Sequence, residues 1–518
     1  MSRAVVFLRE AIEAFHRGES AAELARAREP SGDLEPSSVR HALRLLSNEG
    51  ADALAEARER AELPQDELAW LGLQRPGIRT QLARSRLERA ARKRLAAISS
   101  TTGGHLELGE ELSRIARIAD LRSRDEACRV LETVLRPLAE TRASAQSRLE
   151  SLEHVDIPRQ APKPHSELEP GPEPKSERSS FLIVSAFDSD ILSPPHRGLP
   201  PLPWLVHAQT FLEQTDAAAD DAVRFLVRNV HARSSTGAIP WHTLIGALRA
   251  SELDSEVGRK ERWLRTSAWL RKLGFEEAMS ARLRAETDHG AVVPLSRALC
   301  IDPPRDVRLA QTPRDFGVVS DVCAAEVVAR GLAHALAHVA LPPELRYPVG
   351  ASVAGSIGTL GMLAWIDRQQ LRRLQGLTSA QSERVSRIGA TAVLLWARLC
   401  ASLALMPASE PEQPRARLEL LTDTVGRALC ARIEPGIAGV LAPDLIYARA
   451  RALEALCGVA SATGLREQLN ADWYRNPRTD DLLRGLAQRG NRLSPEAMCS
   501  ELGCGLADAS ARAIELVS

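Results

Sequence analysis

Lysine is almost absent from this sequence of 518 residues. It occurs at five positions only, so arginine carries nearly all of the positive charge, as is typical of a GC-rich genome. Lys+Arg and Asp+Glu both number 67, and the formal net charge is zero. A chain without excess positive charge cannot hold nucleic acid through bulk attraction to phosphates. We therefore expect no nucleic-acid partner.

The spacing of the cysteines does not indicate a metal site. Of the eight cysteines, only Cys499 and Cys504 are close in sequence, and a single C-x4-C pair lacks the second pair of a zinc site. Scattered cysteines of this kind are typical of reduced thiols in a cytoplasmic protein. We expect no secretory signal, because Arg9 and Glu10 interrupt the first apolar run. We expect a bacterial cytoplasmic protein.

One segment is long and uncharged enough to suggest a membrane span, at Val349–Ile366. Four glycines make it only modestly apolar, so we interpret it as a buried helix and expect no membrane association. Nucleotide-binding glycine motifs, the G-x-S-x-G elbow and fixed-period repeats are absent from the sequence. The sequence therefore offers no signature of a nucleotide-binding protein, an α/β-hydrolase or a solenoid.

Apolar residues recur at the helical period along most of the chain, which predicts a mainly α protein. Residues 1–154 form the predicted N-terminal helical domain, and 204–518 form a larger helical domain. Between them, residues 155–203 are a proline-rich linker with a short strand at Phe181–Phe187. Three short segments that are partly β-branched predict a small sheet, at Ala281–Glu286, Val292–Ile301 and Val307–Ala310. A long helix is predicted to start between Thr312 and Ser320.

That long helix carries the segment Arg330-Gly-Leu-Ala-His334-Ala-Leu-Ala-His338. Its spacing is similar to HExxH, in which two histidines one turn apart bind zinc and a glutamate acts as general base. Two registers are possible. One pairs His334 with His338 and puts alanine at the base; the other puts Arg330 at the first ligand, Gly331 at the base and His334 at the second ligand. Neither register contains a residue that could deprotonate water.

Four segments support the second register. Arg330–Leu336 resembles the His-Glu-Leu-Gly-His-Ala-Leu of the oligoendopeptidase F and thimet-oligopeptidase group of zinc peptidases. Three further segments follow in the order of that group, at Leu341–Arg346, Val349–Val353 and Asp472–Pro477 with Leu482–Leu486. The resemblance covers roughly residues 204–518 and implies a multi-helix, zincin-type fold with a small sheet beside the former zinc helix. It places the third zinc ligand at Gly355.

The resemblance implies a degenerate metal site at Arg330, Gly331, His334 and Gly355. A guanidinium repels zinc, so we expect no cofactor and no catalytic residue. Glu326 precedes Arg330 by one turn, the favourable order for an ion pair that would hold Arg330. The alternative to a degenerate metal site is a compensating zinc site built from His334, His338 and an unidentified acid. Other residues that could line the cleft, by their position or by the resemblance, are Glu326, His338, Tyr447 and His289.

The function that the resemblance implies is that of a catalytically inactive peptidase homologue. Its partner would be a peptide or a protein, such as an active peptidase relative that it regulates or scaffolds. Two alternatives stay open at this point: an active zinc oligopeptidase with atypical ligands, and a purely structural helical scaffold. The sequence carries no signal of the oligomeric state.

Overall fold

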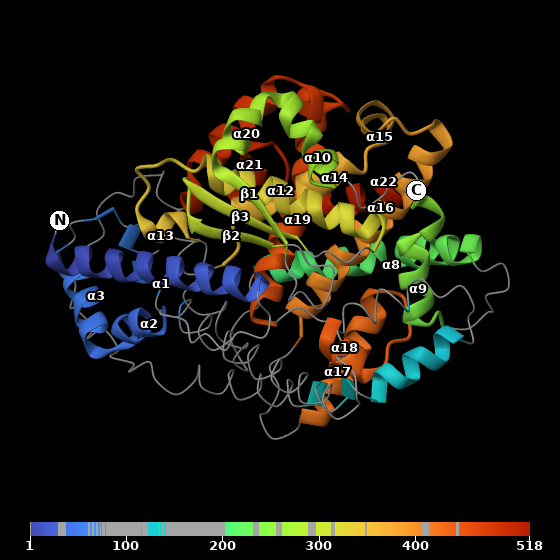
Figure 1. Ribbon diagram of the computed structural model, residues 1–518, viewed down its shortest axis with the longest axis horizontal. Helices are drawn as coiled ribbons and strands as arrows, with labels where there is room; N and C mark the ends of the chain where they lie inside the picture. The colour runs from blue at the N-terminus through green and yellow to red at the C-terminus, as the bar shows by residue number, and fades with distance from the viewer. Residues whose placement is uncertain are drawn as a thin grey trace, which may run out of the picture.

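The computed structural model describes residues 2–28, 38–60, 203–230, 238–254, 262–287, 297–311, 316–347, 350–406, 414–441 and 445–518, with shorter runs between 63 and 140. Its described part is mainly α with one small sheet, which confirms the predicted fold class (Figure 1). The predicted linker and strand in residues 155–203 lie outside the described residues, except for Pro203.

The N-terminal helices form a small core of their own. Helices α1 (Arg3–Arg28), α2 (Ser38–Leu46) and α3 (Asn48–Arg60) pack together at one end of the molecule. The apolar residues of α1 recur at the helical period and lie buried against α2 and α3, at Val5, Leu8, Ile12 and Phe15. The opposite face of α1 is therefore left for polar contacts with the rest of the chain.

The larger core is built from helices in the C-terminal part of the chain. They are α8 (Pro203–Val230), α9 (Trp241–Arg249), α10 (Arg262–Leu270), α11 (Glu276–Arg282), α12 (Val318–Leu336), α13 (Pro343–Arg346), α14 (Val353–Trp365), α15 (Arg368–Gln375), α16 (Ser379–Ala404), α17 (Pro414–Ala428), α18 (Pro435–Leu441), α19 (Leu445–Leu469), α20 (Arg478–Gln488), α21 (Pro495–Glu501) and α22 (Asp508–Val517). Residues of the predicted N-terminal domain also enter this core, at Ile115, Cys128, Leu131 and Leu135.

The sheet has three strands, β1 (Leu283–Thr287), β2 (Arg297–Asp302) and β3 (Asp306–Gln311). Their order is β1-β3-β2, with β1 parallel and β2 antiparallel to the central β3. All three overlap the predicted strands. Helix α12 packs on the sheet, while α1 lies beside β2 (Figure 1). The sheet therefore lies between α12 and the N-terminal helices.

Helices α12, α14 and α19 form the centre of the large core. Helix α14 packs against both α12 and α19, and every one of its residues is buried. Glycine permits the close approach, because a Cβ atom on Gly361 would lie 2.5 Å from the Cβ atom of Ala329 in α12. The uncharged segment that suggested a membrane span is thus a buried core helix, as predicted.

One described helix, α16, has the length and mean hydropathy of a membrane span. However, 78% of its apolar window is buried within the protein. It packs against α8, α17 and α19, so its hydrophobicity is accounted for by helix–helix contacts.

Candidate functional site

Three residues of the predicted site lie one turn apart on α12, at Glu326, Arg330 and His334. All three point into the interior, where α12 meets α14 and α19: Glu326 is 9% exposed and His334 is 7% exposed. The Nε atom of Arg330 donates to Oε1 of Glu326 at 2.6 Å. The ion pair predicted for Arg330 is therefore present.

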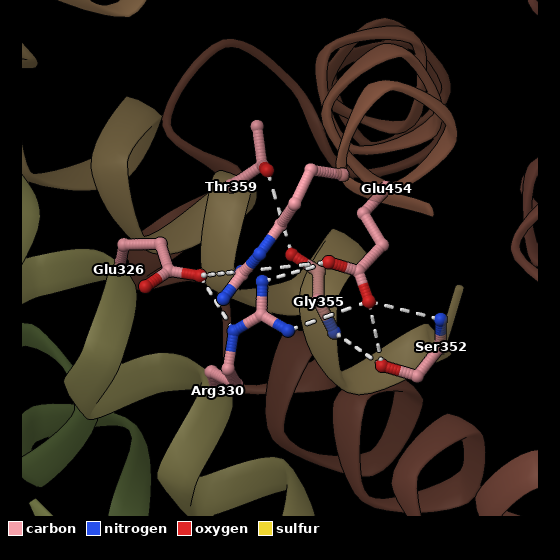
Figure 2. Close-up of polar contacts among 7 residues, drawn as sticks. Glu326, Arg330, Ser352, Gly355, Thr359 and Glu454 are labelled. Carbon is pink, nitrogen blue, oxygen red and sulfur yellow. Dashed lines mark hydrogen bonds and ion pairs between the residues drawn. The ribbon is translucent and has the colours of Figure 1, made fainter. Parts of the chain in front are cut away.

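A second acid, Glu454 of α19, holds the other end of the guanidinium. The Nη1 and Nη2 atoms of Arg330 donate to the two oxygens of Glu454 at 3.3 and 2.8 Å. The Oε1 atom of Glu454 also accepts from the backbone N–H and the hydroxyl of Ser352 at 3.0 and 2.9 Å. Ser352 caps the N-terminus of α14, so the carboxylate lies where a helix favours negative charge. Figure 2 shows this carboxylate between Arg330 and Ser352.

Arg451, one turn before Glu454 on α19, completes a balanced cluster of two arginines and two glutamates. Its Nη1 atom lies 3.3 Å from Glu326 and 3.5 Å from Glu454. The Arg451 side chain is 36% exposed, whereas the Arg330 side chain is 11% exposed and that of Glu454 is 5%. We call these four residues, Glu326, Arg330, Arg451 and Glu454, the charge cluster; Arg451 is its member nearest to solvent.

Mutual pairing keeps Arg330 and Glu454 ionised. Burial alone would lower the pKa of Arg330, but Glu326 and Glu454 outweigh it and raise that pKa. Burial likewise would raise the pKa of Glu454, yet Arg330 and Arg451 hold it below its usual value. A buried charge is tolerated only with such partners, so each ion depends on the others.

Gly355 explains why Glu454 fits. A Cβ atom on Gly355 would lie only 1.9 Å from Cδ of Glu454. The carboxylate of Glu454 thus fills the space that a side chain at the predicted third-ligand position would need (Figure 2). A Cβ atom on Gly331, at the predicted base position, would lie 2.4 Å from Cδ2 of Leu309 in β3. Both glycines face occupied space.

This arrangement does not fit a zinc ion. The predicted first-ligand position holds a guanidinium, which cannot act as a ligand. The predicted third-ligand position has no side chain, and the acid beside it is engaged by Arg330 and Ser352. Within the described residues, no group of three His, Cys, Asp or Glu side chains is placed to hold a metal ion. The charged side chains form ion pairs within α12 and between α12 and α19 instead of a metal site.

The prediction that the long helix carries the whole segment from Arg330 to His338 is wrong at its end. Helix α12 ends at Leu336, and Ala337 already has non-helical backbone angles. The backbone N–H of His338 donates to the carbonyl of Gln488, at the end of α20, instead of continuing the helix. His338 is therefore exposed while His334 is buried, and the structure does not bring the fallback pair of ligands together.

Two predicted cleft residues are not placed. His289 lies outside the described residues, and Tyr447 falls in α19 at a position whose side chain lies outside them. Glu454 and Arg451 are the site residues that the sequence reasoning missed. A signal for Glu454 does exist, because it is a lone acid within the apolar run Ala452–Ala462.

His334 gives the site a dependence on pH. Burial, with the charge of Arg330 beside it, lowers the pKa of His334 from 6.5 to about 4. The folded state then binds fewer protons than the unfolded state between these pH values. Stability is fully present above pH 6.5 and declines as the pH falls towards 4, by roughly 3 kcal/mol for this one group.

We expect His334→Gln to flatten this decline. The measurement is the free energy of urea unfolding at pH 7, 6 and 5, for the wild type and the variant. His338→Gln is the matched control, since it removes an exposed histidine four residues away. An unchanged slope in His334→Gln would show that His334 is protonated, or exposed, in the folded protein.

Comparisons with known proteins agree on the fold. Neither a protein-family profile nor a curated protein sequence matches the chain. Among solved structures, a carboxypeptidase from Pyrococcus furiosus matches 100% of this chain and 98% of its own, at 12% identity and a TM-score of 0.56. An M32 carboxypeptidase from Deinococcus radiodurans R1 matches 99% of this chain and 98% of its own, at 15% identity and a TM-score of 0.51. PZ peptidase A matches 99% and 95%, at 8% identity and a TM-score of 0.59.

The described part of the chain therefore shares its fold with these peptidases. Identities this low establish the fold alone. The predicted peptidase-like architecture is confirmed, whereas the finer assignment to the oligoendopeptidase F and thimet-oligopeptidase group stays a prediction.

Proposed function

We propose that this protein is a catalytically inactive member of the peptidase fold, related to the oligoendopeptidase F group, that binds a peptide or a protein segment. The observation that carries the proposal is the contact of Arg330 with Glu454. In the register that puts Arg330 at the first ligand position, this ion pair lies where a peptidase would hold its metal. Glu454 occupies the space that a side chain at residue 355 would need. An ionic contact links α12, α14 and α19 in place of a metal.

The rival proposal, an active zinc oligopeptidase with atypical ligands, has less support. It needs His334 and His338 on one face, whereas one is buried and the other is exposed beyond the end of α12. A base is also lacking near His334, because Glu326 and Glu454 are both engaged by arginines. We therefore propose peptide binding in the cytoplasm, with a purely structural helical scaffold as the remaining alternative.

We expect the purified protein to carry far less than one zinc per chain and to leave oligopeptides intact. The measurements are elemental analysis after dialysis, and hydrolysis of quenched-fluorescent octapeptides with and without added zinc, cobalt or manganese. A zinc peptidase taken through the same dialysis is the control. About one zinc per chain that resists dialysis, or metal-dependent hydrolysis, would support the rival proposal instead.

A further inference from the structure

Three of the cysteines meet where α21 packs on α19. Cys457 lies in α19, Cys499 lies in α21, and Cys504 follows the end of α21. Hydrogen bonds join the thiol of Cys499 to the thiols of Cys457 and Cys504. The proposed peptide-binding function gives none of these side chains a role.

The end of α21 brings Cys499 and Cys504 together. The backbone N–H of Cys504 donates to the carbonyl of Cys499 at 3.0 Å, and that of Gly503 donates to the carbonyl of Ser500 at 3.1 Å. Gly503 has a φ of 73°, the left-handed conformation with which many helices end in this way. Adding the covalent distances on either side of the 3.0 Å contact keeps the two cysteine Cα atoms within about 7 Å, the limit for a disulfide.

Cys504 is the member of this cluster that solvent can reach. Cys457 is 0% exposed and Cys499 is 1% exposed, whereas Cys504 is partly exposed. The Sγ atom of Cys504 donates to the carbonyl of Cys499 at 3.2 Å, and Sγ of Cys499 donates to the carbonyl of Cys457 at 3.4 Å. The hydroxyl of Ser461 lies 3.5 Å from Sγ of Cys499. A reagent from solvent therefore meets Cys504 first.

These contacts hold the thiols in their protonated form. Hydrogen bonding to Cys457 raises the pKa of Cys499, and hydrogen bonding to Cys499, together with burial, raises the pKa of Cys504. A thiol attacks a disulfide as the thiolate, so the first reaction at Cys504 is slow. Its neighbour then reacts within the same molecule, which favours closure of a ring. The redox poise around the protein therefore decides how much of the pair is oxidised at equilibrium.

We propose that Cys504 and Cys499 form a redox site that reacts with a low-molecular-weight disulfide, RSSR, and closes into an intramolecular disulfide. In the first step the Cys504 sulfur attacks RSSR and forms a mixed disulfide, and the RSH that leaves takes up the Cys504 proton. In the second step the Cys499 sulfur attacks the Cys504 sulfur, and the second RSH leaves with the Cys499 proton. The protein is oxidised by two electrons and RSSR is reduced by two.

Closure of the disulfide changes the contact between α21 and α19. Oxidised Cys499 has no thiol proton to donate to the carbonyl of Cys457, so this hydrogen bond between the helices is lost. Cys457 lies about one turn after Glu454, and α19 also carries Arg451. Oxidation thus acts on the helix that holds two members of the charge cluster. The inference does not depend on the proposed peptide-binding function.

The test equilibrates the full, folded chain with mixtures of oxidised and reduced glutathione, blocks the remaining thiols and maps all linkages by mass spectrometry. Wild type should contain at least ten times more Cys499–Cys504 disulfide than any other linkage. Cys504→Ser should leave Cys499 reduced, and Cys499→Ala should stop after the first step, with glutathione retained on Cys504. Cys430→Ser is the matched control, since Cys430 is also partly exposed and its thiol contacts the carbonyl of Arg427. It should oxidise as wild type does.

A second measurement follows the helix contact. Amide hydrogen exchange in α21 should rise at least threefold in the oxidised wild type and stay constant in Cys504→Ser; equal exchange in both would overturn the effect on α21. If Cys499→Ala does not fold, Cys499→Ser is the more conservative trap. Glutathione retained on Cys504 of the wild type would overturn the second step, and a main product linking Cys457 to Cys499 would overturn the entry through Cys504. Eight reduced cysteines in every mixture would overturn the site.

Discussion

Glu454→Gln is expected to lower the free energy of unfolding by about 3 to 5 kcal/mol. The substitution keeps the size of the side chain and removes its charge. Arg330 is then left with Glu326 as its main partner, in a site where its side chain is 11% exposed. The amide nitrogen of glutamine donates and cannot accept, so where it replaces Oε2 an unfavourable contact with Nη2 of Arg330 replaces a good one.

A double-mutant cycle separates the charge from the packing. If Arg330→Met is added to Glu454→Gln, no unpaired guanidinium remains, and part of the lost stability should return. Glu326→Ala alone should cost less, about 1 to 2 kcal/mol, because Arg330 keeps its two contacts with Glu454. Equilibrium unfolding in urea of the single and double variants provides all of these values.

The control is Glu501→Gln, which breaks the exposed contact with Arg489 and should cost less than about 1 kcal/mol. A cost that small for Glu454→Gln would place Arg330 in contact with water. A larger cost for Glu326→Ala than for Glu454→Gln would show that the α12 pair, and not the link to α19, carries the cluster.

We expect zinc binding only if the predicted zinc ligands are restored and Glu454 is removed as well. The variant is Arg330→His, Gly331→Glu, Gly355→Glu and Glu454→Ala. It supplies two imidazoles, a carboxylate and a base in HExxH order, and it clears the space beside residue 355. At residue 331 the side chain of Leu309 must shift, because a Cβ atom there would lie 2.4 Å from its Cδ2 atom. Glu326 keeps Arg451 as a partner at 3.3 Å. We expect about one zinc per chain after dialysis, and a Tm that rises with free zinc.

The matched control is the triple variant that keeps Glu454. It should stay free of zinc and lose stability, because the new side chain at residue 355 would begin 1.9 Å from Cδ of Glu454. Zinc binding by the triple variant would show that Glu454 moves aside without difficulty. A folded quadruple variant without zinc would show that the register placing Arg330, Gly331 and Gly355 at the metal is wrong.

The helices were predictable because their apolar residues repeat at the helical period. Even the uncharged α14 was predicted to be buried, since its glycines lower its hydrophobicity. The end of the long helix was not predictable in this way: α12 ends at Leu336, before His338. Short-range patterns place helices well but locate their ends poorly.

The site was predictable only where its parts are neighbours in sequence. Glu326 and Arg330 are one turn apart, so their contact follows from helix geometry alone. Arg330 and Glu454 are separated by 124 residues, and no local pattern connects them. Likewise, the end of α12 before His338 depends on the carbonyl of Gln488, a tertiary contact that periodicity does not report.

Helix α1 contacts the rest of the chain through ion pairs, of Arg9 with Glu344 in α13 and of Arg17 with Asp302 in β2. This polar character has a consequence for synthesis on the ribosome. Glu344 follows Arg9 by 335 residues, so at about 5 to 20 residues per second α1 is translated roughly 17 to 67 s before its partner. During that interval its apolar stripe is covered by α2 and α3, which are complete by residue 60. The face of α1 that has no partner during this interval carries Arg9 and Arg17, and water solvates arginine well. The nascent N-terminus can thus fold early and dock late, with little need of a chaperone to shield it.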